Sequence, residues 1–139
     1  MIPFYAQDHD YKQFNVLAVD DIPLNLLLVQ KMLSRFNFRL RTASNGQQAL
    51  DAVAELRPDL ILLDLMMPGI DGFEVIRRLR EDPKTANIQI VILSALNSNE
   101  DVVKGFNLGA NDYIMKPIIM EKLLSCVVTQ LKIAEVKRA

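Results

Sequence analysis

Short apolar runs alternate along the chain with longer segments in which apolar residues recur every three or four positions. Runs of this length predict buried strands, whereas the recurring pattern predicts helices. Strands are predicted at residues 15–19, 60–63, 88–93 and 112–115, with one more at 38–43. The segment 38–43 alternates apolar and basic residues, which indicates an edge strand with only one buried face.

Proline and glycine mark the limits of the predicted helices. Pro23 lies in the first turn of the first helix, where its missing N–H costs nothing, and Pro58 follows the second. Gly109 is the natural C-cap of the fourth. The helices are predicted over about 23–36, 46–56, 71–80 and 99–108, and a fifth carries Leu123, Leu124, Val127, Val128 and Leu131 at helical spacing.

Five strands that alternate with five helices predict an α/β protein. We expect a doubly wound five-stranded parallel sheet in the order 2-1-3-4-5, the flavodoxin-like (βα)5 arrangement. In such a sheet the strand order reverses between strands one and three. Ligand sites form there, at the carboxyl ends of the strands.

The first helix presents two kinds of apolar residue. Its predicted core stripe, which shares one face of a helical wheel, is Leu28, Val29, Met32, Leu33 and Phe36. Leu24 and Leu27 fall outside this stripe, among polar residues. We therefore expect these two leucines to be exposed, and we hypothesise that they dock a partner helix.

Composition and charge limit the classes of protein. The 139 residues suffice for one domain, and a net charge of −1 argues against direct nucleic-acid binding. No apolar segment reaches the roughly 18 residues of a membrane span. The single cysteine, Cys126, excludes an internal disulfide and suits the cytoplasm. Residues 1–13 lack the apolar block of a signal peptide and are predicted to be a flexible lead-in to one domain over 14–139.

Polar residues stand where four of the predicted strands end. Asp20 and Asp21 follow the first strand, Asp64 the third, Ser94 the fourth and Lys116 the fifth. The carboxyl ends of parallel strands share one edge of the sheet, so we expect these five side chains to converge.

Three close carboxylates repel one another, and a hard divalent cation relieves that repulsion. Mg²⁺ prefers oxygen ligands and often combines one or two carboxylates with a phosphate. The lysine adds a fixed positive charge and the serine a hydrogen-bond donor, so the set suits a phosphoryl group. The site has no histidine or reactive cysteine, which leaves a carboxylate as the nucleophile.

Each residue taken alone has an ordinary explanation. Asp20 and Asp21 suit a turn and a helix cap, Asp64 a loop acid, Ser94 a turn and Lys116 a surface charge. Chance rarely places all of them, in this order, at successive strand ends.

Four segments resemble the receiver domains of two-component response regulators, of the kind typified by the chemotaxis regulator. They are Val19-Asp20-Asp21, the stretch from Asp64 to Gly72, Ser94-Ala95, and the stretch from Asp112 to Pro117. The resemblance covers about residues 15–130. It implies a phosphoacceptor signalling domain that catalyses only its own phosphorylation and dephosphorylation.

The resemblance also implies roles for the acids and the lysine. Asp64 would accept a phosphoryl group from a phosphohistidine. Asp21 would bind Mg²⁺ directly and Asp20 largely through water, with Asp64 and the Met66 backbone carbonyl as further ligands. Lys116 would pair with the Asp64 carboxylate and then with the phosphoryl oxygens, and its bond to Pro117 is expected to be cis.

Further roles concern switching and hydrolysis. Ser94 would hydrogen-bond the phosphoryl group and shift its loop, and Tyr113 resembles the rotating aromatic switch of the family. Met66 and Leu96 are apolar where other members are more polar. We therefore expect them to modulate hydrolysis by failing to orient the attacking water.

The partners implied are a sensor histidine kinase or a histidine phosphotransfer protein, and an output domain or target protein. A homodimer through the helix over 99–108, the strand 112–115 and the last helix is a further expectation. Whether the domain is free-standing or belongs to a longer regulator or hybrid kinase stays open.

Two other classes compete with this interpretation. A pseudo-receiver that acts purely as an interaction module would lack one of the acids or the lysine, and all are present. A haloacid-dehalogenase-like phosphatase would carry a second aspartate two residues after Asp64, where Met66 stands. The absence of a glycine-rich turn after the first strand argues against a dinucleotide-binding domain.

Overall fold

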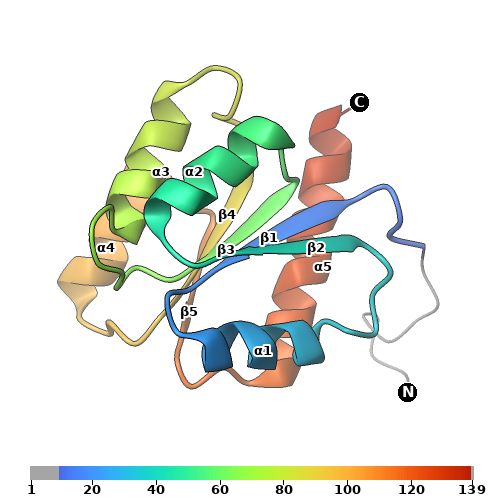
Figure 1. Cartoon of the computed structure of the whole chain (residues 1–139), viewed down its shortest axis with the longest axis horizontal. Coiled ribbons are helices and arrows are strands. Elements are labelled where there is room, and N and C mark those ends of the chain that lie inside the picture. Colours follow the sequence, from blue (N-terminus) through green and yellow to red (C-terminus); the bar gives the residue numbers. More distant parts are fainter. Residues whose placement is uncertain (1–9, 139) are drawn as a thin grey trace.

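The computed structural model describes residues 10–138 as a five-stranded parallel sheet between two layers of helices (Figure 1). The strand order β2-β1-β3-β4-β5 confirms the prediction. The elements are β1 (Asn15–Val19), α1 (Pro23–Met32), β2 (Arg39–Ala43), α2 (Gly46–Glu55), β3 (Leu60–Leu63), α3 (Gly72–Glu81), β4 (Gln89–Ser94), α4 (Asn99–Leu108), β5 (Asp112–Met115) and α5 (Met120–Arg138).

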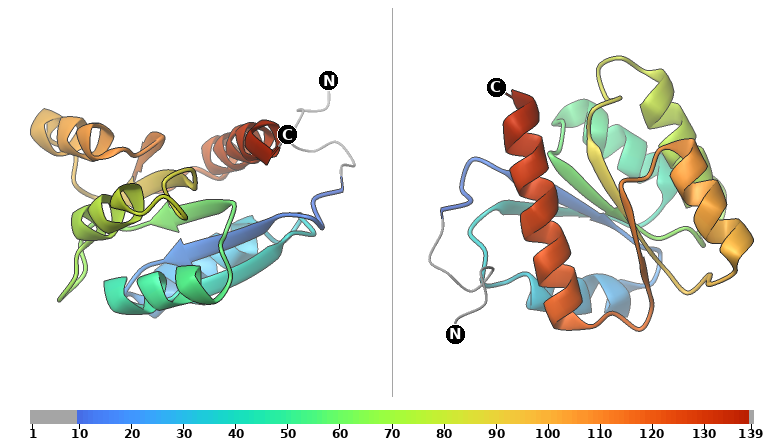
Figure 2. Two further views of the ribbon diagram at one scale, coloured as in Figure 1. Left: turned by 90° about the horizontal axis from the view of Figure 1, so that it is seen from above. Right: turned by 180° about the vertical axis from the view of Figure 1, so that it is seen from behind.

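The helices are divided between the two faces of the sheet (Figure 2). Helices α1 and α5 pack on one face with Val16 and Ala18 of β1, and α2, α3 and α4 pack on the other with Leu17 and Val19. The central strands are buried on both faces, which explains their continuous apolar runs. Strand β2 lies at the edge with exposed arginine and threonine side chains, as its alternation predicts.

Helix α1 departs from its prediction. It ends at Met32, and Leu33 and Phe36 reach the core from the turn that follows. The buried stripe runs through Leu26 and Val29, so the assignment of Leu28 to the core was wrong, and Leu28 is 46% exposed. The wheel failed because it extended the helix to Phe36 and centred the stripe on the wrong positions.

The predicted lead-in is in part packed. Residues 1–9 lie outside the described residues. The Tyr11 side chain is buried, its ring meets that of Phe36 edge-on at 5.2 Å, and its backbone N–H donates to Asn37 Oδ1 at 2.7 Å. The expectation of flexibility therefore does not hold at Tyr11, because aromatic packing fixes the chain before β1.

The end of α5 is tied to the start of β1. The Arg138 guanidinium donates to the buried carboxylate of Asp59 and, at 3.2 Å, to the carbonyl of Gln13. It also lies over the Phe14 ring, 5.0 Å from its centroid. Within residues 10–138, no helix has the length and apolar character that crossing a membrane requires.

Candidate functional site

The sheet brings the five predicted polar residues to its carboxyl edge. Asp20 and Asp21 follow β1, Asp64 follows β3, Ser94 is the last residue of β4 and Lys116 follows β5. Asp20, Asp64 and Ser94 are buried and Asp21 is half-buried. One carboxylate oxygen from each of the three acids lies within 4.8 Å of the others. The three carboxylates thus form a single cluster, which we call the acidic cluster.

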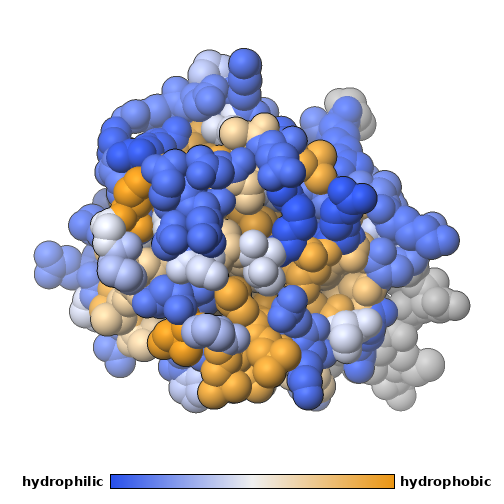
Figure 3. Space-filling view, in the orientation of Figure 1, coloured by the Kyte–Doolittle hydropathy of each residue, from blue (hydrophilic) through white to orange (hydrophobic). Residues whose placement is uncertain are grey.

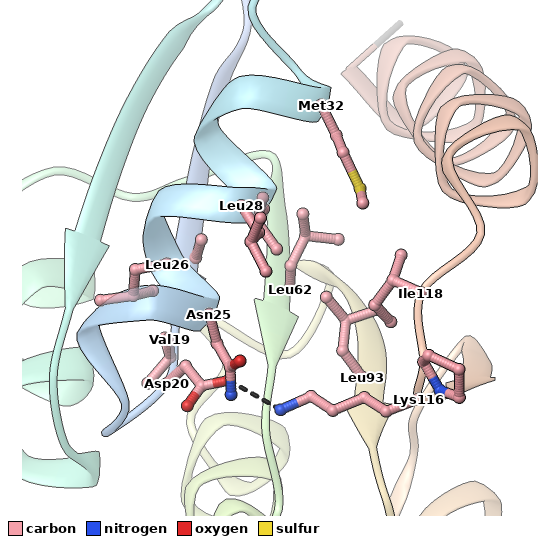
Figure 4. Close-up of a pocket in the computed structure, with 13 residues that line it drawn as sticks. Val19, Asp20, Asn25, Leu26, Leu28, Met32, Leu62, Leu93, Lys116 and Ile118 are labelled. Atoms are coloured by element: carbon pink, nitrogen blue, oxygen red, sulfur yellow. Dashed lines mark hydrogen bonds and ion pairs between the residues drawn. The ribbon is translucent and has the colours of Figure 1, made fainter.

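Lys116 bridges two members of the acidic cluster. Its ammonium donates to Asp20 Oδ2 at 2.8 Å (Figure 4). It also lies 3.8 Å from Asp64 Oδ1. The shorter contact is thus to Asp20, whereas the resemblance implies a pair with Asp64. The bond between Lys116 and Pro117 is cis, which confirms that prediction.

The acidic cluster contains three carboxylates, and Lys116 supplies the one nearby positive charge among the described residues. Burial raises the pKa of the Asp64 carboxyl, and the charges of Asp20 and Asp21 raise it further. Lys116 and a hydrogen bond from the Met66 N–H act in the opposite direction. Asp21 Oδ1 is buried and has no hydrogen-bond partner within the described residues. An orphaned carboxylate oxygen among two other acids fits a hard divalent cation that prefers oxygen ligands.

The Leu96 backbone, in the loop after β4, links Ser94 to Tyr113 of β5 by two hydrogen bonds. The Ser94 hydroxyl accepts a hydrogen bond from the Leu96 N–H at 3.2 Å, and the Tyr113 hydroxyl donates to the Leu96 carbonyl at 2.6 Å. Helix α4 packs closely beside this contact, because a Cβ at Gly105 would come within 2.6 Å of an Ile92 methyl. A movement of the Ser94 hydroxyl would therefore reach Tyr113 through one residue, Leu96.

The loop after Asp64 depends on two glycines whose role sequence reasoning missed. Gly69 has a φ of 76°, a left-handed conformation that disfavours other residues. A Cβ at Gly72 would lie 2.5 Å from the Asp64 carbonyl oxygen, so α3 can begin close to the acidic cluster only with glycine there. Their place in Met67-Pro68-Gly69 and Asp71-Gly72, between a strand and a helix, was the available signal.

An apolar surface on α1 adjoins the site. Leu24 is 61% and Leu27 is 48% exposed, which confirms the predicted exposure. Figure 3 shows apolar side chains gathered over α1. A pocket of about 270 Å³ lies between α1 and the segment after β5, with Asp20 and Lys116 at one end (Figure 4). This pocket was not predicted, because its walls come from α1 and from the segment after β5.

Comparisons with known proteins agree with this geometry. Residues 16–128 match the family model of the response regulator receiver domain. The chain is 44% identical over 103 residues to the response regulator PleD of Caulobacter vibrioides, covering 74% of this chain and 23% of that protein. It is 42% identical over 123 residues to the DNA-binding response regulator MtrA of Mycolicibacterium smegmatis, covering 88% and 53%.

A solved structure is similar over nearly its whole length. The signal receiver domain of a signal transduction histidine kinase from Syntrophus aciditrophicus has a TM-score of 0.82 at 32% identity, covering 91% of this chain and 94% of that one. By contrast, this chain spans only about a quarter to a half of the two curated relatives.

Proposed function

The chain belongs to the response regulator receiver domains of two-component signalling, and we propose that Asp64 is its phosphoacceptor. The observation that carries this proposal is the acidic cluster itself. The Asp64 carboxylate is buried at a strand end, close to two other acids and 3.8 Å from the Lys116 ammonium. A carboxylate in this setting is a nucleophile beside groups that can receive a phosphoryl anion.

The proposed reaction transfers one phosphoryl group. An Asp64 oxygen forms a bond to phosphorus while the bond between phosphorus and the donor's imidazole nitrogen breaks, and the imidazole leaves with the electron pair of that bond. Asp20, Asp21 and Asp64, with the Met66 backbone carbonyl, would hold Mg²⁺. The ion would offset the negative charge that an incoming phosphoryl group meets.

Lys116 and Ser94 complete the proposed site. The Lys116 ammonium would exchange its contact with Asp20 for the phosphoryl oxygens, since it lies between the two carboxylates. The Ser94 hydroxyl would donate to a phosphoryl oxygen and give up its bond with the Leu96 N–H. Because the Leu96 carbonyl accepts from Tyr113, this exchange would free the aromatic ring to move.

We propose a sensor histidine kinase or histidine phosphotransfer protein of the cytoplasm as the donor, docked on the exposed leucines of α1. Replacing Leu27 with glutamate should slow transfer from the cognate phosphohistidine while leaving phosphorylation by a small donor unchanged. Transfer at the wild-type rate in a folded variant would contradict the docking proposal.

Output would pass to an attached domain or a target, or through a homodimer of the α4–β5–α5 face.

Phosphorylation with acetyl phosphate and Mg²⁺, followed by intact mass, tests the phosphoacceptor. We expect one phosphate adduct on the wild type, none on Asp64→Asn, and an adduct on the control Asp51→Asn, whose carboxylate is exposed on α2. Excess chelator should suppress the reaction. An adduct that persists on Asp64→Asn, or that forms fully in chelator, would overturn the assignment.

A further inference from the structure

A second pocket lies between the C-terminal ends of α2 and α3, which stand side by side on one face of the sheet (Figure 1). These helix ends lead into β3 and β4, so the pocket is at the opposite end of the sheet from the acidic cluster. Its volume is about 500 Å³, within the range of small-molecule sites. Apolar side chains of both helices line it, namely Leu50, Val53, Ala54 and Leu79. We call it the α2–α3 pocket.

The rim of the α2–α3 pocket is cationic. Arg57, Arg78 and Lys84 line it together with one acid, Asp82. Arg57 Nε donates to the Lys84 carbonyl at 3.1 Å, and this bond joins the loop after α2 to the loop after α3. Arg78 is paired with Glu74 at 2.8 Å. The terminal nitrogens of Arg57 and the Lys84 ammonium, by contrast, have no hydrogen-bond or ion-pair partner among residues 10–138.

Further cations lie near this end of the sheet, outside the pocket. Burial lowers the pKa of Lys137, and the positive charges of Arg80 and Arg57 lower it further, so cations gather here. The C-terminal carbonyls of both α2 and α3 would repel an anion. Arg41 offsets those of α2 by donating to the carbonyls of Ala52, at 2.9 Å, and Leu56.

The loop at the mouth of the α2–α3 pocket is held in place by its own hydrogen bonds. The Thr85 hydroxyl donates to the Leu79 carbonyl at 2.7 Å, and the Thr85 N–H donates to the Asp82 carbonyl at 3.0 Å. The Asp82 carboxylate accepts from the Lys84 N–H at 2.9 Å, which turns its charge toward the backbone. A pocket already formed in this way loses little ordering free energy on binding.

We propose that the α2–α3 pocket binds a small organic anion with an apolar body, such as a carboxylate on an aliphatic chain. The chain of the ligand lies against Leu50, Val53 and Leu79, and its charge meets Arg57 and Lys84. This site is separate from the acidic cluster and requires no phosphorylation. Its ligand differs from a phosphoryl group in needing apolar contact as well as positive charge.

Octanoate is the probe that tests the site. Titrated into the ¹⁵N-labelled protein, it should cause saturable changes in amide chemical shifts confined to about residues 50–57 and 79–85. Acetate carries the charge without the chain, and 1-octanol carries the chain without the charge. Both should bind at least tenfold more weakly, because each supplies only one of the two interactions.

Two matched double variants distinguish binding in this pocket from nonspecific electrostatic attraction of octanoate to the protein. Arg57→Gln/Lys84→Gln should weaken octanoate binding about tenfold or more. Lys12→Gln/Lys122→Gln removes the same charge from exposed positions elsewhere and should leave binding unchanged. The proposal is overturned if no saturable shifts occur, if they map to α1 and Pro117, if 1-octanol binds equally, or if both double variants bind alike.

Discussion

The two ends of the sheet treat their buried carboxylates differently. At the amino end, Asp59 accepts hydrogen bonds from the backbone and side chain of Asn15, at 2.8 and 3.3 Å, and from Arg138. Gln89 donates to Gln130 at 2.5 Å. At the carboxyl end, Lys116 pairs with two of the three acids, Asp20 and Asp64, and a carboxylate oxygen of Asp21 has no partner within residues 10–138.

This difference separates stability from function within one fold. At the amino end, Asn15 and Arg138 satisfy the Asp59 carboxylate and hold α5 on the sheet, although Asn15 Oδ1 is buried without a hydrogen-bond partner among residues 10–138. The acidic cluster lacks a complete set of partners, so a divalent cation would be stabilised there. The comparison predicts that removing Asp59 lowers the free energy of unfolding far more than removing an acid of the acidic cluster does.

The largest effect is expected from Asp59→Ala. It leaves the buried Asn15 N–H without its acceptor and Arg138 without its carboxylate, so we expect a loss of about 2–4 kcal/mol in the free energy of unfolding. Urea titration in chelator measures it. The matched variant Asp21→Ala should change the free energy of unfolding by less than about 1 kcal/mol, since it removes a carboxylate that the two neighbouring acids repel. A larger loss in Asp21→Ala would break the comparison.

Addition of Mg²⁺ should stabilise the protein from the carboxyl end. At a free concentration of 100 times its dissociation constant, an ion that binds only the folded state adds about 2.7 kcal/mol. Thermal unfolding with and without Mg²⁺ measures this gain. The gain should persist in Asp59→Ala and fall sharply in Asp21→Ala, and equal gains in both variants would place the ion elsewhere.

Two apolar side chains at the carboxyl end should prolong the phosphorylated state. Met66 is 55% exposed and Leu96 is half-buried, and neither can hold a water by hydrogen bonding. General acid–base assistance is worth 10²–10⁴-fold and mere positioning less, so Met66→Asn/Leu96→Glu should lose phosphate about tenfold faster. Mass measurements after donor removal follow the decay. The control Met120→Asn/Val136→Glu on α5 should decay like wild type, and an unchanged rate in the test variant would refute a role in water access.

The smallest expected effect is a gain of stability in Asp64→Asn. In chelator at neutral pH, removing this buried charge should stabilise the fold by roughly 1 kcal/mol. The pKa of Asp64 is raised in the folded protein, so protonation of this carboxyl favours the folded state. This stabilisation is fully present below the ordinary pKa of 3.8 and is lost as pH rises through the raised pKa. Stability of the wild type should therefore fall relative to Asp64→Asn over that range. Parallel pH profiles from urea titrations would contradict this account.

The sequence was most informative where one residue pattern has one structural meaning. Continuous apolar runs define strands buried on both faces, so the strand order and the gathering of Asp20, Asp64 and Lys116 followed from them. The extent of α1 did not, because Leu26 and Leu28 are equally apolar and only packing decides which is buried.

The remaining differences arise from contacts distant in sequence. Tyr11 packs because Phe36 and Asn37 happen to lie beside it. The preference of Lys116 for Asp20 is set by a difference of about an ångström between two carboxylates, which no spacing along the chain encodes. The α2–α3 pocket likewise depends on loops that meet only in the folded molecule.

The hydrogen bond between Arg138 and the Gln13 carbonyl has a consequence for gene fusion. Gln13, before β1, and Arg138, in the last turn of α5, thus lie next to each other at the amino end of the sheet. A domain with adjoining entry and exit can be spliced before, after or between other domains without strain on its fold. Asp64 lies at the far end, so a new neighbour would leave the acidic cluster open. Recombination can thus give one receiver many outputs.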